Sequence, residues 1–194
     1  MSLLLRKLFL LSCVLCLVSC GFRPVYQDSH QAYGVETEDK LAAIRIGNIG
    51  PNDGRTEQML RTNLEKALNL RSINVPQEYT LEITLTESLE SLGVKKDREI
   101  TRYNLVYTAH FNLLKNGIKT PVKRGKSRIA GGYDAVSSDF ATYAAEKDIK
   151  GRIMNELAND IKTRLSSFFL TGLESKVLLE IEKEERKNNE DNLQ

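Results

Sequence analysis

The sequence predicts one α+β domain, a two-layer sandwich in which a four-stranded, mostly antiparallel sheet carries two helices on one face. Residues 79–89 and 101–114 alternate apolar and polar side chains, as strands with one buried face do. Residues 55–70 and 139–170 instead repeat apolar side chains every three or four positions, as helices with one buried stripe do. The predicted order over residues 41–172 is β-α-β-β-β-α, which leaves the other sheet face for solvent or a partner.

The first predicted strand and helix lie in residues 41–70. In the run LAAIRIGNI, Ile44, Ile46 and Ile49 stand among small residues, which favours a strand. The sequence GPNDG at 50–54 predicts a turn. The helix that follows has one apolar face, made by Met59, Leu60, Leu64, Ala67 and Leu68.

Residues 79–131 predict a three-stranded antiparallel meander. The first two strands alternate cleanly, and the second ends in Lys115-Asn116-Gly117. The dipeptide Asn-Gly is the strongest short hairpin signal. The third strand, at 118–131, is less regular and much more basic.

The longest predicted element is a helix at about 139–170, which a serine or aspartate among residues 137–139 can cap. Its apolar stripe consists of Ala141, Ala145, Ile149, Ile153, Leu157, Ile161, Leu165 and Phe168. About thirty helical residues span about 45 Å, so this helix must cross a whole sheet face. Gly172 is predicted to end it, and the strongly charged residues 173–194 predict a frayed, disordered tail.

The first nineteen residues have the organisation of an export signal. Two basic residues, Arg6 and Lys7, precede an apolar run of eleven residues that ends at Val18. This run is too short to span a bilayer, which needs about twenty residues, but it has the length of a secretory signal core. The sequence Leu17-Val18-Ser19-Cys20 resembles a bacterial lipobox, which implies cleavage before Cys20 and acylation of that cysteine. An ordinary signal peptide that is cut nearby is the alternative.

The residues around the lipobox bear on compartment and chemistry. Gly21 follows the cysteine, where lipoproteins retained at the inner membrane carry aspartate, so the resemblance implies the outer membrane. Two or three acyl chains make attachment in effect permanent, and no amphipathic anchor helix is then needed. Cys13 and Cys16 lie inside the apolar run, which favours a place in the leader over a zinc or redox site. The sequence therefore predicts a lipoprotein signal peptide at 1–19 and a lipidated tether at 20–40.

Charge is unevenly distributed along the chain. The formal charge of +2 equals the contribution of the two basic residues in the leader, so the mature chain is nearly neutral. Residues 95–128 nevertheless hold ten basic and two acidic side chains, which suggests an anionic partner. A solvated face that acidic segments balance is the alternative. The side chains that we expect to bind the anion are Lys95, Lys96, Arg98, Arg102, Lys123, Arg124, Lys126 and Arg128. Nucleic acid is a poor candidate, because an exported lipoprotein would rarely meet it.

The sequence contains no recognisable catalytic set, and we predict a non-enzymatic protein without cofactor or metal. GxSxG, HExxH, P-loop and GxGxxG motifs are absent. His30 lies in the predicted tether, and His110 lies on the polar side of a strand between Thr108 and Asn112. No pair of carboxylates has the contrasting environments of an acid and a base.

Two parts of the chain resemble the LptE family of lipopolysaccharide-assembly lipoproteins. The sequence CGFRPVY at 20–26 resembles the mature start of these proteins, and residues 137–169 resemble their C-terminal helix. Ile149 departs from the family pattern, in which alanine is commoner. The matching helix positions are Phe140-Ala141, Ala144-Ala145-Glu146, Asp148, Arg152, Leu157-Ala158, Ile161 and Arg164-Leu165.

This resemblance implies a function as well as a fold. It implies an outer-membrane lipoprotein on the periplasmic side that binds lipopolysaccharide, plugs the β-barrel protein LptD and supports its assembly. The resemblance carries over no ligand-contacting residue. The assignment of the eight basic side chains to anion binding therefore depends on their clustering in the sequence alone. The alternative is a structural scaffold lipoprotein of another envelope complex, which would contact protein but no glycolipid.

Overall fold

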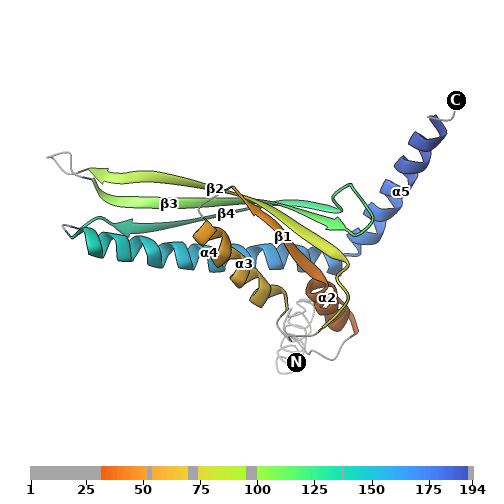
Figure 1. Cartoon of the computed structure of the whole chain (residues 1–194), viewed down its shortest axis with the longest axis horizontal. Helices are drawn as coiled ribbons and strands as arrows, with labels where there is room; N and C mark the ends of the chain where they lie inside the picture. Colours follow the sequence, from red (N-terminus) through yellow and green to blue (C-terminus); the bar gives the residue numbers. More distant parts are fainter. Residues whose placement is uncertain (1–31, 52–53, 70–73, 95–99, 137, 192–194) are drawn as a thin grey trace, which may run out of the picture.

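The computed structural model describes residues 32–51, 54–69, 74–94, 100–136 and 138–191. Figure 1 shows an elongated two-layer domain with a long sheet on one side and helices on the other. The elements are α2 (Ala32–Ala42), β1 (Ile44–Gly50), α3 (Gly54–Leu68), β2 (Tyr79–Val94), β3 (Ile100–Lys115), β4 (Lys123–Asp134), α4 (Asp139–Leu170) and α5 (Leu173–Asp191). The α+β class and the four-stranded sheet agree with the sequence prediction.

The four strands form one mixed sheet in the order β1-β2-β3-β4. β1 runs parallel to β2, whereas β2, β3 and β4 are antiparallel neighbours, which confirms the predicted meander. The turn between β3 and β4 starts at the predicted Asn-Gly pair. Gly117 has a φ of 84°, a conformation that glycine adopts without steric cost, and the Ile118 N–H donates to the Lys115 carbonyl at 3.0 Å.

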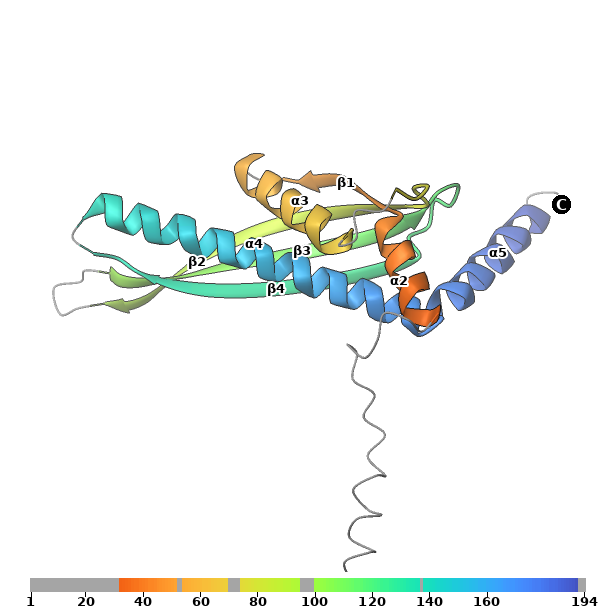
Figure 2. The same cartoon turned by 90° about the horizontal axis from the view of Figure 1, so that it is seen from below.

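Helices α3 and α4 cover the same face of the sheet (Figure 2). The side chains that alternate inward from β2 and β3 meet the apolar stripes of both helices in one core. The N-cap of α4 is Ser138, whose Oγ accepts the Ala141 N–H at 3.4 Å. Gly172, with a φ of 63°, follows the C-cap Thr171 of α4 and directly precedes α5.

Two glycines of β4 leave space that core side chains of β3 and α4 fill. A Cβ atom at Gly125 would lie 2.1 Å from Cζ of Phe111, the residue opposite it on β3. A Cβ atom at Gly131 would lie 2.5 Å from Cδ1 of Ile149 on α4. The core therefore fills the space that these two positions leave empty, and β4 contributes backbone rather than side chains there.

The helix count and arrangement differ from the sequence prediction at both ends of the domain. Helix α2 occupies most of the second half of the predicted tether and continues to Ala42, and its Leu41 is buried in the core. Helix α5 occupies most of the predicted disordered tail, where Ile181 is buried and Val177 and Leu178 pack against the core. The prediction followed the high charge of the tail and ignored these apolar positions, which keep helical spacing.

Candidate functional site

The strongest candidate for ligand binding lies on the sheet face opposite α3 and α4. Figure 1 shows no described helix over this face. Three basic residues of β4 are exposed there at alternate positions, namely Arg124, Lys126 and Arg128. Because strand side chains alternate with a period of two, the three lie in one row, about 7 Å apart. We call them the basic row.

Polar side chains extend the basic row across the sheet. The strand register places Asn112, His110 and Thr108 of β3 beside Arg124, Lys126 and Arg128, respectively. The next positions across, on β2, are Glu82, Thr84 and Thr86. Cationic groups of β4 thus stand next to hydrogen-bonding groups of β3, with the carboxylate of Glu82 one strand further on, and cationic and hydrogen-bonding groups together can bind phosphate and hydroxyl groups of one ligand.

Only three of the eight basic residues expected from the sequence belong to this row. Lys123 is the first residue of β4 and has the inward phase, with its Nζ 5.7 Å from the centre of the buried Phe168 ring. Arg102 lies nearer the far end of the sheet, where its guanidinium is 3.7 Å from the Asp134 carboxylate. Its charge is therefore partly balanced. Lys95, Lys96 and Arg98 lie outside the described residues, as does the predicted acylation site Cys20.

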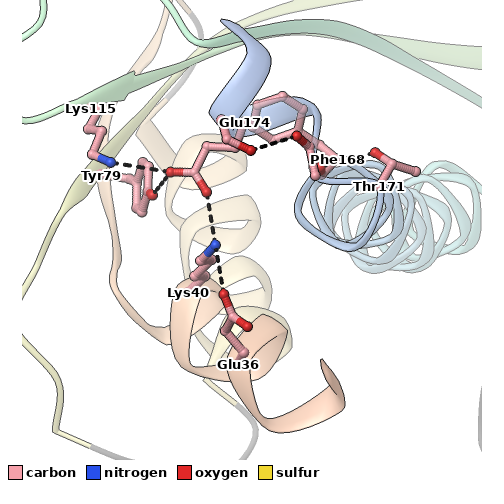
Figure 3. A network of polar contacts seen from close by, with 9 residues as sticks. Glu36, Lys40, Tyr79, Lys115, Phe168, Thr171 and Glu174 are labelled. Carbon is pink, nitrogen blue, oxygen red and sulfur yellow. Dashed lines mark hydrogen bonds and ion pairs between the residues drawn. The ribbon is translucent and has the colours of Figure 1, made fainter. Parts of the chain in front are cut away.

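A second polar cluster, which the sequence prediction missed, joins α2, the sheet and α5 (Figure 3). Its centre is Glu174, whose side chain is only 8% exposed. Its carboxylate accepts from Lys40 Nζ at 3.0 Å, from Lys115 Nζ at 3.3 Å and from the Tyr79 hydroxyl. Lys40 also reaches Glu36 at 3.1 Å. One carboxylate thus connects three elements that are distant in the sequence.

The electrostatics of this cluster favour the ionised pair. Burial alone would raise the pKa of Glu174, but the hydrogen bonds from Tyr79 and Lys40 hold it below its ordinary value. Burial alone would lower the pKa of Lys40, whereas its hydrogen bonds to Glu174 and Glu36 raise it overall. Burial and the adjacent carboxylate both raise the pKa of Tyr79. The cluster therefore stays charged and paired near neutral pH, as a structural connection does.

A signal for this cluster was present in the sequence. Glu174 stands three, four and seven residues before Val177, Leu178 and Ile181, which places all four on one side of a helix. Reading that side as buried would have predicted a buried carboxylate in need of cationic partners.

Among the described residues there is neither a group of side chains that could hold a metal ion nor a helix that could span a membrane. Across the described ranges, no three His, Cys, Asp or Glu side chains are grouped so that they could hold a metal ion. His110 is exposed on the open sheet face. None of the helices in the described part of the chain combines the length and the apolar character needed to cross a membrane.

Comparison with known proteins yields one family and several similar folds. A model of the LptE family, described as lipopolysaccharide-assembly, matches residues 41–165. No curated protein matches the chain significantly. The crystal structure of a candidate lipoprotein from Caulobacter crescentus CB15 is 23% identical, with a TM-score of 0.56, over 71% of this chain and 96% of that chain.

Two further lipoprotein structures are similar at lower scores. A minor lipoprotein from Acinetobacter baumannii is 16% identical, with a TM-score of 0.48, over 66% of this chain and 94% of that chain. An uncharacterized lipoprotein B from Nitrosomonas europaea is 16% identical, with a TM-score of 0.49, over 68% of this chain and 86% of that chain. At 23% identity the Caulobacter structure shows similarity of fold alone.

The family match and the fold agree with each other. The matched segment runs from the end of α2 into the last turns of α4, so it includes the whole sheet and both helices that cover it. It extends over more than half of the chain, and α5 lies beyond it. The chain therefore belongs to the LptE family of lipopolysaccharide-assembly proteins.

Proposed function

We propose that this chain is a non-enzymatic outer-membrane lipoprotein that binds lipopolysaccharide and plugs the LptD barrel, whose assembly it supports. The observation that carries the proposal is the family match over residues 41–165. The lipobox resemblance at Cys20 and the glycine after it support a lipid anchor in the outer membrane, with the domain on the periplasmic side. Both residues precede the described part of the chain.

The open sheet face supports contact with the headgroup of lipopolysaccharide. The phosphates of lipid A are matched by the basic row, since guanidinium groups bind phosphate through two parallel hydrogen bonds and lysine adds a point charge. The neighbouring threonine, asparagine and histidine side chains suit sugar hydroxyls. These side chains are polar, so we place the phosphorylated headgroup rather than the acyl chains on this face.

Reversing the charge of the basic row tests this binding surface. The triple variant R124E/K126E/R128E is expected to bind purified lipopolysaccharide at least tenfold more weakly, because each charge-assisted hydrogen bond contributes about 1.5–3 kcal/mol. All three side chains are exposed, so the melting temperature should change little. Titration of the variant and the wild-type protein with the same lipopolysaccharide measures the difference.

A matched control separates a specific site from a general charge effect. The variant K147E/R152E/R164E makes the same change in net charge on exposed positions of α4, in the helix layer. It disrupts two exposed pairs within α4, each worth about 0.3–0.5 kcal/mol. We expect its binding of lipopolysaccharide to stay within twofold of wild type. Unchanged binding by the β4 variant, or an equal loss in both variants, would show that the basic row is not the site.

A further inference from the structure

Helix α5 has two unlike sides, and only one of them belongs to the core. On the inner side, Glu174 and Ile181 are buried and Val177 and Leu178 are half-buried. This side accounts for the packing of the first half of the helix against the core. The side chains of the opposite side are exposed, so packing within the described fold does not explain them.

The opposite side carries a basic stripe with one leucine. Lys176, Leu179, Lys183 and Arg186 follow one another at spacings of three, four and three residues, which keeps them on one side of a helix. All four are exposed, and Leu179 exposes 56% of its surface. Arg186 is paired with Glu182 at 3.7 Å, but both side chains are largely in water, so the pair is weak. We call these four residues the α5 outer stripe.

The α5 outer stripe lies at the end of the molecule where the N-terminal segment joins the domain. Figures 1 and 2 show α5 and α2 at the same end of the sheet, and the Lys40–Glu174 contact of 3.0 Å joins the two helices. Two more leucines, Leu170 and Leu173, are exposed where α4 turns into α5. The α5 outer stripe therefore offers basic and apolar side chains at this end, although α5 as a whole holds seven acidic and four basic residues.

The length of the chain before α2 limits how far this end can be from a lipid anchor. Cys20 and Ala32, the first residue of α2, are twelve positions apart, which span at most about 40 Å when fully extended. The sixteen residues of β2 alone extend over about 50 Å away from this end. A membrane that holds the acyl chains is thus nearest to α2 and α5.

We propose that the α5 outer stripe rests on the anionic phospholipid surface of the membrane to which the chain is anchored. Lys176, Lys183 and Arg186 contact lipid phosphates, and each basic residue near such a surface strengthens binding about fivefold. Leu179 enters the boundary between headgroups and acyl chains, as the apolar residue of an interfacial helix does. The proposal rests on the acylation of Cys20 that is part of the proposed function, and it gives the anchored domain a fixed orientation.

Single-cysteine labelling tests the contact on the mature, acylated protein. The three cysteines of the chain lie at positions 13, 16 and 20, so an acylated Cys20 leaves no free thiol. Leu179→Cys is labelled with bimane, and the protein is reconstituted in vesicles of phosphatidylcholine with or without phosphatidylglycerol. A shallow spin-labelled lipid is expected to quench the label strongly in the anionic vesicles and weakly in the neutral ones. Leu92→Cys, exposed on the distal half of β2, is expected to stay unquenched in both.

Charge variants show whether the basic residues cause the contact. In the Leu179→Cys protein, K176E/K183E/R186E is expected to lower quenching in anionic vesicles to the level of neutral vesicles. K147E/R152E/R164E carries the same charge change on exposed positions of α4 and is expected to leave quenching unchanged. Equal quenching at positions 92 and 179, or no effect of the α5 variant, would overturn the proposed contact.

Mass spectrometry of the mature N-terminus distinguishes a failure of the acyl anchor at Cys20 from a failure of the α5 contact. If Cys20 is acylated and the label at 179 stays unquenched, the contact of α5 is wrong while the anchor stands. If Cys20 is unmodified, the anchor fails, and the proposed contact fails with it.

Discussion

Gly125→Ala is expected to destabilise the domain by about 3 kcal/mol, near the upper end of what overpacking a core costs. The added methyl group would lie 2.1 Å from Cζ of Phe111 and within 2.7 Å of two further ring carbons. Phe111 is only 1% exposed, so the ring cannot move into solvent to make room. Urea unfolding of the variant and the wild-type protein measures the loss as a lower midpoint at unchanged slope.

Two comparisons show whether this contact is the cause. Gly132→Ala lies on the same strand, but its methyl group would meet the exposed Arg102 side chain at 3.2 Å, which can move aside. We expect Gly132→Ala to change the free energy of unfolding by less than about 0.5 kcal/mol. In a Phe111→Leu background, Gly125→Ala should cost clearly less than in the wild type. The explanation fails if the cost is the same in both backgrounds, or if the two alanine variants are equally unstable.

Glu174→Ala is expected to lower stability by about 2 kcal/mol and to expose the amides of α5 to hydrogen exchange. Removing one partner of a buried ion pair leaves the other charge uncompensated, at a cost of about 3–5 kcal/mol when both are fully buried. Lys40 and Lys115 are each 31% exposed, so water replaces part of the lost interaction and the smaller value applies. Glu182→Ala, on the exposed side of the same helix, is the matched control and should change stability by less than about 0.5 kcal/mol.

The contribution of Glu174 should depend on pH in the acid range. Folding lowers the pKa of this carboxyl, so its stabilisation is fully present above its ordinary value of 4.5 and is lost as the pH falls through the lower folded value. The stability difference between wild type and Glu174→Gln should therefore be constant from pH 5 to 7 and shrink below pH 4.5. A difference that is independent of pH down to pH 2 would mean that the carboxylate charge does not stabilise the cluster.

Local patterns in the sequence were sufficient for most of the sheet and for the main helices. In the strands that became β2 and β3 most side chains alternate between apolar and polar, with Glu87 and Val106 as exceptions, and Asn116-Gly117 marks the turn after them. The apolar stripe of α4 keeps its period over the whole helix, and its predicted bounds agree with the structure. Each of these features depends on neighbours within a few positions, which is the range that a sequence pattern reports directly.

The features that the sequence prediction missed depend on distant contacts. The inward side of β4 carries Gly125, Ser127 and Gly131 besides Ile129 and Tyr133, so the first half of the strand gives no apolar signal of its phase. Lys123 was therefore grouped with Arg124, although the two belong to opposite faces. These glycines are explained by Phe111 and Ile149, which fill the space from β3 and α4.

The ends of the domain illustrate the same limit. High charge suggested that the C-terminal residues are disordered, but α5 is held by contacts of Glu174 with α2, β2 and β3. Those partners lie 134, 95 and 59 positions away in the sequence. For the basic row, charge clustering in the sequence was enough to select its three residues among eight candidates. Only the strand register showed which of the eight share a face.

The central claim is tested most directly by purifying the tagged, mature chain from outer membranes in detergent and identifying what is bound to it. We expect a one-to-one complex with a large outer-membrane barrel of the LptD type, together with lipopolysaccharide detected in the same fraction. Recovery of the chain with a different envelope assembly, without a barrel and without lipopolysaccharide, would contradict the proposed function and support a scaffold lipoprotein instead.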